Sequence, residues 1–353
     1  MPSLLPQRYT RPELAQLDAG QQESEILLSR LERELNSVYG QAAEEMKQKA
    51  LDYLSWFQKT DAIKRKQWKD GKLTKKEYQQ WRYSHMLTGK RWFEYANILA
   101  TDLTDTNLIA ASIVNGYTPE AYAVGINYST YNIEHSGEID TSFTLYSKQT
   151  VEYLVRENPQ LLPTARVNIP KDKQWNLSCL NSAVTQGILQ GESMDEIAQR
   201  LANVSTMSEK AAIRNARTMV TSAENAGRND GFIRADKMGI DLVIEWSATL
   251  DKRTRTSHRA LDGTTRKVGE YFVLDDETMG TVKIAYPADM GGAEYKVPPS
   301  MVYNCRCTLQ AWVKGFEHTN EVKYSPKMGD LTYEQWKKAK PEYKSKTKAA
   351  KQK

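Results

Sequence analysis

Long apolar stretches, cysteines and histidines are scarce in this chain of 353 residues, and each scarcity excludes a class of protein. No stretch approaches the roughly 18 apolar residues that a membrane-spanning helix needs, and the best candidate, 108–114, is far too short. The N-terminal sequence MPSLLPQRYTRPEL lacks the charged region and apolar core of a secretion signal. Three cysteines are too few for a disulfide framework and favour a reducing compartment. We therefore expect a protein made in a bacterial or other cytoplasm and not associated with a membrane.

The standard sequence signatures of enzymes are also missing. The chain has no Walker-type phosphate loop, no dinucleotide-binding glycine fingerprint, no nucleophile elbow and no His-Glu-x-x-His pair. Its four histidines leave few candidates for acid–base catalysis. These absences predict that the protein is not an enzyme.

The net charge of +5 is concentrated at the C-terminus. Residues 337–353 contain eight lysines and one glutamate, which gives this segment +7 and leaves −2 for residues 1–336. Such a segment is expected to be disordered and can attract the phosphates of DNA, although a solvated tail that only aids solubility explains it equally well. The residues proposed to contact double-stranded DNA are Lys344, Lys346, Lys348, Lys351 and Lys353.

The N-terminal part of the chain has helical periodicity. Apolar residues at steps of three and four predict an amphipathic helix from about residue 21 to 60. Further helices are predicted over 75–99, 102–114, 119–133, 146–156, 176–190, 193–201 and from 208 to about 231 or 239. The helix at 75–99 is rich in aromatic residues, which either stack on nucleic acid bases or, as we favour, pack against other helices or a partner subunit.

The pattern changes near Gly239, after which short alternating segments predict strands over 241–250, 271–274, 282–286 and 308–313. Prolines in the stretch 157–173 indicate a linker. The predicted fold class is α+β, with a mainly helical N-terminal region followed by a small α+β module and a disordered basic tail. The predicted boundaries are 1–157 for the helical region, 158–175 for the linker, 176–313 for the module and 314–353 for the tail.

One histidine and a Cys-x-Cys pair form a partial metal site in the C-terminal module. His258, Cys305 and Cys307 are side chains that bind Zn²⁺, but a structural site needs four ligands and the usual spacing is Cys-x₂₋₄-Cys. If Cys305 and Cys307 lie in a strand, they point to the same face and can both reach His258. A fourth ligand would come from Asp251, Asp262 or water. The alternative is that the two thiols are small buried groups and His258 is a packing residue, so no cofactor is required and zinc is optional.

The charged run from Asp251 to Arg255 allows two interpretations as well. It can supply a catalytic carboxylate with arginines that stabilise an anion, but no base or nucleophile accompanies it. We favour a structural role, in which Asp251 caps the following turn and accepts charge-assisted hydrogen bonds from an arginine.

An ordered set of motifs resembles one protein family. The set comprises Arg217, Thr221 and Glu224 on a helix, then Trp246, Asp251, Arg253, Thr254, Arg255, His258, Leu261, Asp262, Gly263, Pro298, Pro299, and finally Asn304, Cys305, Arg306 and Cys307. It is similar to the phage Mu F-like minor head proteins, the head-morphogenesis or minor capsid proteins of tailed double-stranded DNA phages and prophages. Within this set, Trp246, Asp251, Arg253, Arg255, Gly263, Asn304 and Arg306 are the expected structural motif.

The resemblance implies a virion protein at the portal vertex or inside the head, assembled in the bacterial host cytoplasm. Its implied partners are the portal, major capsid and scaffolding proteins, with a contact to packaged DNA as a further expectation. Some family members carry toxin domains such as ADP-ribosyltransferase modules, and the 46 residues after Cys307 are expected to be too few for one. The alternative function is a metal-dependent enzyme or toxin-like effector that acts on nucleic acid or nucleotide through His258, Cys305 and Cys307.

Overall fold

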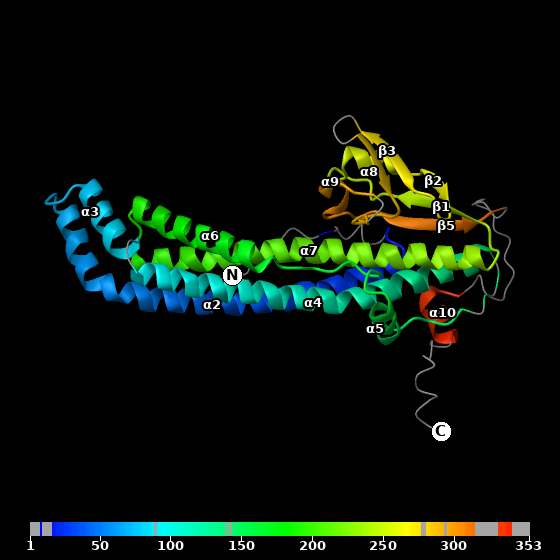
Figure 1. Ribbon diagram of the computed structural model, residues 1–353, viewed down its shortest axis with the longest axis horizontal. Coiled ribbons are helices and arrows are strands. Elements are labelled where there is room, and N and C mark those ends of the chain that lie inside the picture. The colour runs from blue at the N-terminus through cyan, green and yellow to red at the C-terminus, as the bar shows by residue number, and fades with distance from the viewer. Residues whose placement is uncertain are drawn as a thin grey trace, which may run out of the picture. The chain divides into compact units, whose positions relative to one another are not determined.

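The predicted fold class is confirmed: long helices dominate, and the strands are confined to the C-terminal part (Figure 1). The computed structural model describes residues 8, 16–87, 90–137, 139, 141, 143–276, 280–292, 295–314 and 331–340. The N-terminal elements are α2 (Ala19–Lys69), α3 (Lys75–Arg82), the π-helix η1 (Tyr83–Leu87), α4 (Lys90–Gly137), α5 (Lys148–Glu157), α6 (Ile169–Gln190) and α7 (Met194–Lys237). The C-terminal elements are β1 (Leu242–Ser247), α8 (Thr256–Leu261), β2 (Thr265–Lys267), β3 (Phe272–Asp276), β4 (Gly280–Ile284), α9 (Pro299–Val302), β5 (Thr308–Val313) and α10 (Tyr333–Ala339). None of the described helices is both long enough and apolar enough to span a membrane.

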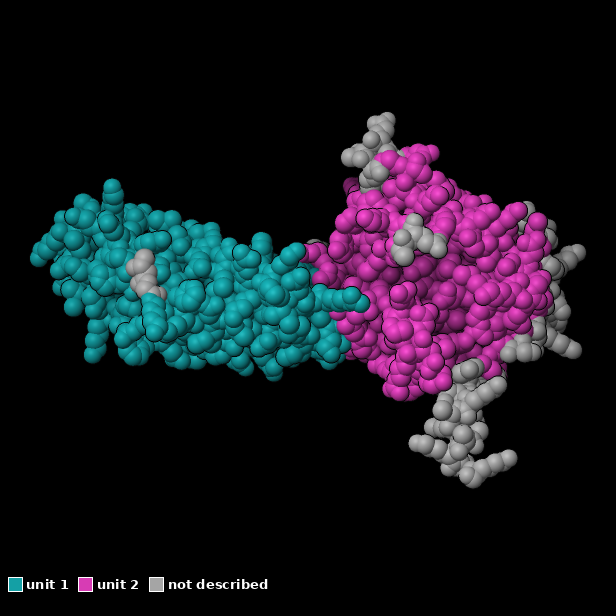
Figure 2. Space-filling view, in the orientation of Figure 1, with its two compact units in different colours: residues 1–7, 32–113, 166–213 teal, residues 8–31, 114–165, 214–353 magenta. Residues whose placement is uncertain are grey.

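The chain forms two compact units that interleave along the sequence (Figure 2). Unit 1 contains residues 1–7, 32–113 and 166–213, and unit 2 contains residues 8–31, 114–165 and 214–353. Helices α2, α4 and α7 each contribute residues to both units. The domain boundaries predicted from the sequence are consecutive, because composition and periodicity do not reveal which stretches of a long helix share a core.

Helix α4 is longer than the sequence predicts. Separate helices are expected over 102–114 and 119–133, with Thr118 as an N-cap, but one helix runs from Lys90 to Gly137 with Pro119 inside it. The Thr118 hydroxyl does not cap a helix start; it donates to the Asn115 carbonyl at 3.0 Å. Tertiary packing therefore overrides the local proline signal here, because residues on both sides of Pro119 are buried.

Helix α7 is also continuous where two helices are predicted, over 193–201 and from 208. Ser193 and Glu196 form the expected start: Glu196 N–H donates to Ser193 Oγ at 3.3 Å, and Ser193 N–H donates to a Glu196 carboxylate oxygen at 2.6 Å. The residues between the two predicted helices, 202–207, stay helical because Leu201, Ala202 and Val204 are buried.

Helix α6 begins inside the stretch 158–175 that is predicted to be a linker. Asn168 is its N-cap and Pro170 lies in its first turn, where a missing N–H is harmless. Within the predicted linker, residues 158–168 lie in neither a helix nor a strand.

The core of unit 1 is an apolar helix bundle. Its buried residues include Leu35, Met46, Leu54, Leu99, Leu103, Leu180, Ile197, Leu201 and Val204. Aromatic residues of the predicted 75–99 helix take part, since Tyr78 stacks on Trp68 with ring centroids 5.3 Å apart. This arrangement agrees with the packing interpretation, although Phe93 of the same segment is 68% exposed.

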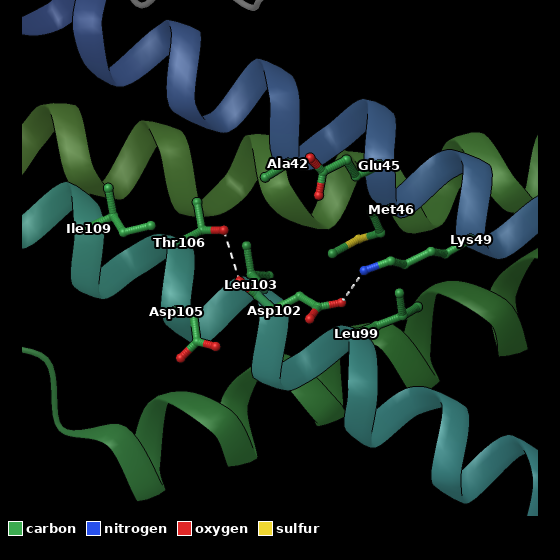
Figure 3. Close-up of a pocket in the computed structure, with 10 residues that line it drawn as sticks. All are labelled: Ala42, Glu45, Met46, Lys49, Leu99, Asp102, Leu103, Asp105, Thr106 and Ile109. Carbon is green, nitrogen blue, oxygen red and sulfur yellow. Dashed lines mark hydrogen bonds and ion pairs between the residues drawn. The ribbon is translucent and has the colours of Figure 1, made fainter.

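A shallow pocket of about 190 Å³ lies between α2 and α4 of unit 1 (Figure 3). Lys49 and Asp102 form an ion pair of 2.8 Å at its edge, and both side chains are more than 40% exposed. A solvated ion pair beside a few aliphatic side chains has no convergent buried polar groups, so we assign the pocket no function.

The strands of unit 2 form two small sheets. Strand β1 pairs antiparallel with β2 and with β5, which gives the order β2-β1-β5, and β3 pairs with β4 as a hairpin. The four predicted strands are present, whereas β2 was not predicted. Its three residues are too few to show a periodic pattern. The core here includes Trp246, Leu261, Phe272, Ile284, Met301 and Leu309.

Candidate functional site

The site begins where α7 packs against the segment that leads into β5. This segment is irregular from Cys305 to Cys307, so its carbonyl groups need partners outside the sheet. Asn225 supplies several: its side-chain amide donates to the Cys307 carbonyl at 3.3 Å, and its side-chain oxygen accepts the Leu309 N–H at 3.0 Å. Two turns earlier on the same face of α7, Thr218 Oγ1 accepts the Asn304 N–H at 3.1 Å.

Arg228 lies on the same face of α7 as Thr218 and Asn225, and we call these three residues the polar face. The Arg228 side chain is 1% exposed. Its guanidinium pairs with Asp18 at 2.7 Å and with Glu224 at 2.8 Å, and it also donates to the Leu309 carbonyl at 3.2 Å. Burial disfavours the charged guanidinium, but the carboxylates of Asp18 and Glu224 outweigh it and raise the pKa of Arg228. Burial raises the pKa of Glu224. The network thus joins α7 to the N-terminal start of α2 and to β5.

Two glycines let α4 and α7 approach closely within unit 2. A Cβ added at Gly227 would overlap the Tyr122 carbonyl oxygen, and one added at Gly125 would overlap the Glu224 carbonyl oxygen. Both obstacles are backbone atoms of a helix, which cannot turn aside as a flexible side chain would. This close contact fixes the position of α7, and therefore of its polar face, relative to α4.

Asp251 holds the loop before α8. Both of its carboxylate oxygens accept from Arg306, at 2.6 Å each, and one accepts the Arg253 N–H at 2.8 Å. These bonds, with the bidentate one from Arg306 foremost, keep the pKa of Asp251 well below its usual value. The contacts agree with the structural role favoured from the sequence and tie the loop to the Cys-x-Cys segment.

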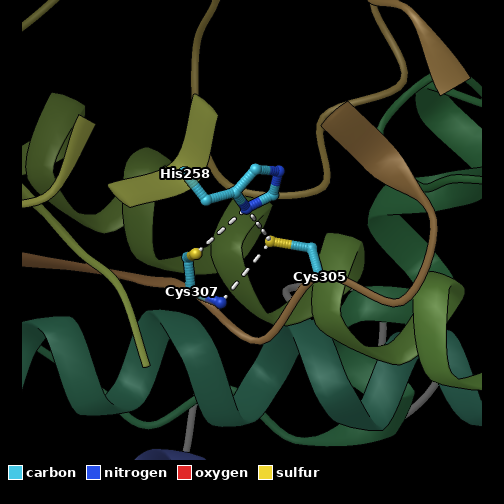
Figure 4. A group of neighbouring side chains, drawn as sticks. All are labelled: His258, Cys305 and Cys307. Atoms are coloured by element: carbon cyan, nitrogen blue, oxygen red, sulfur yellow. Dashed lines mark hydrogen bonds between the residues drawn. The ribbon is translucent and has the colours of Figure 1, made fainter. Parts of the chain in front are cut away.

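His258, Cys305 and Cys307 come together as a buried cluster (Figure 4). His258 Nδ1 lies 3.2 Å from Cys307 Sγ and 3.6 Å from Cys305 Sγ. The exposed fractions are 2%, 1% and 4% for His258, Cys305 and Cys307 respectively. The two cysteines precede β5 instead of lying in a strand, so their common orientation arises from an irregular turn and not from strand alternation.

The surroundings of the cluster shift the pKa values of the two thiols in opposite directions. Burial on its own would raise the pKa of Cys305, but hydrogen bonds with Cys307 and His258 outweigh it and leave that pKa well below the usual value. The pKa of Cys307 is raised well above the usual value by its hydrogen bond with Cys305 and by burial.

Other predicted motif residues shape the backbone around the cluster. Trp246 is fully buried and meets the His258 ring edge to face at a centroid distance of 5.9 Å. Gly263 has a φ of 71° and donates its N–H to the Trp246 carbonyl at 2.9 Å. Asn304 has a φ of 55°, a conformation that asparagine tolerates better than most residues, and it reverses the chain just before Cys305. Arg255 donates to the Tyr303 carbonyl.

Two residues of the helix motif, Thr221 and Glu224, are buried: Thr221 accepts from Arg8, and Glu224 pairs with Arg228. Thr218, Asn225 and Arg228 are the residues that reach the segment from Asn304 to β5. Their spacing of seven and then three places them on one helical face, a signal that was present in the sequence.

Residues 331–340 were expected to belong to a disordered tail, and this expectation is wrong for α10. Trp336 is buried and donates from its indole N–H to Glu134 at 2.6 Å. Lys340 pairs with the same carboxylate at 2.8 Å, and Lys337 pairs with Glu23 at 2.8 Å. Burial of one large aromatic ring outweighs the polar composition of the segment. The five lysines proposed to contact DNA, from Lys344 to Lys353, lie outside the described residues.

Comparison with known proteins gives an independent view of this region. The family model described as "Phage Mu protein F like protein" matches residues 179–310. We call these residues the Mu F-like module, after the family that they resemble. The Mu F-like module contains α7, the polar face, the Asp251 loop, the buried cluster and the first half of β5, so the family resemblance stated from the motifs is confirmed.

Two relatives extend the similarity beyond the Mu F-like module. Minor head protein GP7 of Bacillus phage SPP1 is 29% identical over 244 residues, which cover 66% of this chain and 70% of the relative. The protein named NAD(+)--arginine ADP-ribosyltransferase EFV of Enterococcus faecalis is 25% identical over 256 residues, or 72% of this chain. The match spans half of the length of that second relative. No solved structure matches the chain.

Proposed function

We propose that this chain is a minor capsid protein that acts in head morphogenesis of a tailed double-stranded DNA phage or prophage. The observation that carries the proposal is the similarity to the SPP1 minor head protein, because at 244 residues it covers about two thirds of both chains and is longer than the module at 179–310. The buried polar side chains of the module also support a structural task, since they donate hydrogen bonds to carbonyl groups of its own backbone.

The finer proposal is that the protein joins the portal vertex during prohead assembly in the bacterial cytoplasm, with portal, scaffolding and major capsid proteins as partners. To test it, proheads are purified from the phage that encodes this chain, with its portal gene either intact or deleted. We expect a few copies of the chain per particle, chemical cross-links to portal protein, and loss of the chain from particles without a portal. Absence from proheads and virions alike would overturn the head function, while equal amounts with and without portal would overturn only the vertex location.

We further propose that the lysines at 344, 346, 348, 351 and 353 contact packaged DNA. The support is their charge pattern together with the finding that Lys337 and Lys340, from the same basic stretch, are already paired with carboxylates. Exchanging the five lysines for glutamine should weaken DNA binding and reduce its salt dependence, whereas exchange for arginine should preserve both. Equal binding by both variants would remove the tail from the proposal.

The alternative class is a transferase or metal-dependent enzyme, and the named ADP-ribosyltransferase relative is the observation that favours it. Against it stands the burial of His258, Cys305 and Cys307, which leaves a substrate no access to the only cluster of candidate metal ligands found among the described residues. Incubation of the intact chain with labelled NAD⁺ and an arginine-containing acceptor should give no more incorporation than the heat-denatured chain. Incorporation above that control would replace the structural proposal with an enzymatic one.

A further inference from the structure

The buried cluster has the dimensions of a metal site. A tetrahedral Zn²⁺ with bonds of about 2.3 Å to sulfur and about 2.0 Å to nitrogen separates neighbouring ligand atoms by roughly 3.5 Å to 3.8 Å. The distances from His258 Nδ1 to Cys307 and Cys305, 3.2 Å and 3.6 Å, lie close to this spacing. All three candidate ligand atoms lie within 4.8 Å of one another, so one ion can reach them with small side-chain movements.

The residues are held in place by contacts that do not involve the candidate ligand atoms. Arg8 donates to the Cys305 carbonyl at 2.6 Å and Asn225 donates to the Cys307 carbonyl at 3.3 Å, which fixes both cysteine backbones. The bidentate bond between Asp251 and Arg306 ties the Cys-x-Cys segment to the loop that precedes His258. A site whose ligands are positioned beforehand loses little conformational entropy when it binds an ion.

The chemistry of the cluster suits a soft divalent ion. Two thiols and an imidazole prefer Zn²⁺ to Mg²⁺ or Ca²⁺, which take oxygen ligands. The atom His258 Nε2 is buried and has no hydrogen-bond partner among the described residues, as expected if an additional water or ligand belongs near the ring.

The carboxylates considered from the sequence do not supply a fourth ligand. Asp251 is occupied by Arg306, and Asp262 accepts the Ala248 N–H at 2.7 Å. Among the described residues no further His, Cys, Asp or Glu joins the cluster. Water is therefore the fourth ligand that this arrangement allows within the described part of the chain.

We propose that His258, Cys305 and Cys307 bind one structural Zn²⁺ that fastens α8 to the segment entering β5. The ion lies inside the module and is inaccessible to a substrate, so its task is to hold the loop structure of the module together. This proposal is independent of the head function, because a head protein without zinc and a zinc protein outside the head are both physically possible.

The test starts from the full chain, purified without chelators from cells grown with zinc. Elemental analysis should find close to one zinc per chain, and Cys305→Ser and Cys307→Ser should each reduce it by at least tenfold. Cys179→Ser is the matched control, because Cys179 lies on α6 in unit 1 and should leave the zinc content unchanged. Less than a tenth of an equivalent of zinc in the unaltered chain overturns the proposal, as does retention of zinc by both cysteine variants.

A second measurement covers the case in which the cysteine variants do not fold. The unaltered chain is stripped of metal by dialysis and titrated with Co²⁺, which should produce a thiolate-to-cobalt charge-transfer absorption that Zn²⁺ abolishes. Removal of the metal should also lower the thermal unfolding temperature, and added Zn²⁺ should restore it. No cobalt absorption, or a disulfide between Cys305 and Cys307 in the purified chain, excludes the site.

Discussion

The two halves of helix α7 are built on different principles. Residues 194–213 lie in unit 1 and bury mainly aliphatic side chains, such as Ile197, Leu201 and Val204. Residues 214–237 lie in unit 2 and bury a dense polar set, which comprises Arg217, Thr218, Thr221, Ser222, Glu224, Asn225, Arg228 and Asn229.

The difference follows from what each half packs against. In unit 1 the neighbours are helices, whose backbone groups are already satisfied, so shape and apolar area suffice. In unit 2 the helix meets an irregular segment with free carbonyl groups, and burying those without partners would be unfavourable. The same helix thus contributes a core in one place and a set of hydrogen-bond donors in the other.

The largest effect is expected for Arg228→Met, which removes the centre of the polar half. Asp18 and Glu224 would keep their charges without a partner, and losing one member of a buried ion pair costs about 3–5 kcal/mol. Denaturant unfolding should show this loss in the free energy of unfolding. Adding Glu224→Leu should recover part of it, and a loss below about 1 kcal/mol for Arg228→Met would show that the pairing is not structural.

Leu201→Ala tests the apolar half by the same measurement. The side chain is fully buried, so its truncation should lower the free energy of unfolding by about 2–5 kcal/mol through lost burial and the cavity left behind. Leu201→Met keeps the volume and should cost less than about 1.5 kcal/mol. If the two variants are equally destabilised, the contact depends on shape beyond apolar volume.

Gly227→Ala sharpens the comparison at the point where α4 and α7 come closest in unit 2. The added methyl group would overlap the Tyr122 carbonyl oxygen, and we expect a loss of about 1–3 kcal/mol despite the better helix propensity of alanine. Gly116→Ala on α4 is the control, because no atom lies within 4 Å of a Cβ there, and it should be neutral or slightly stabilising. A stabilising effect at Gly227 would mean that the helices can separate freely.

An effect of about the same size as that of Gly227→Ala is expected for Asn225→Ala. It leaves the Cys307 carbonyl and the Leu309 N–H without their partner, and an unsatisfied buried group costs about 1–3 kcal/mol. Hydrogen exchange should accelerate at the Leu309 amide more than at amides of β1 further from the helix. Unchanged protection at Leu309 would show that the Asn225 contact does not hold β5.

The sequence was sufficient for the features that depend on local patterns. It predicted the helical body, the four longer strands and the grouping of His258 with Cys305 and Cys307. The ordered motifs also indicated the similarity to phage Mu protein F, and two of their residues, Asn304 and Gly263, have positive φ angles.

Features set by distant partners could not be predicted. Arg8 lies 213 residues from Thr221 and Asp18 lies 210 residues from Arg228, and the sequence around these residues gives no sign of either pairing. Pro119 and the polar stretch after Leu201 resemble helix ends locally, and burial keeps both inside long helices. Trp336 gives α10 its anchor, but one aromatic ring among lysines carries little signal before its partner Glu134 is known.

The pairing of Arg228 with Asp18 has a consequence for biosynthesis. Unit 1 draws its last residues from 166–213, whereas unit 2 needs residues 8–31 together with strands near the end of the chain. On the ribosome, unit 1 can therefore close while the second unit still waits for β5 to be translated. Asp18, just before α2, would stay unpaired during that interval, which leaves the nascent protein exposed to proteases and aggregation until β5 has been translated.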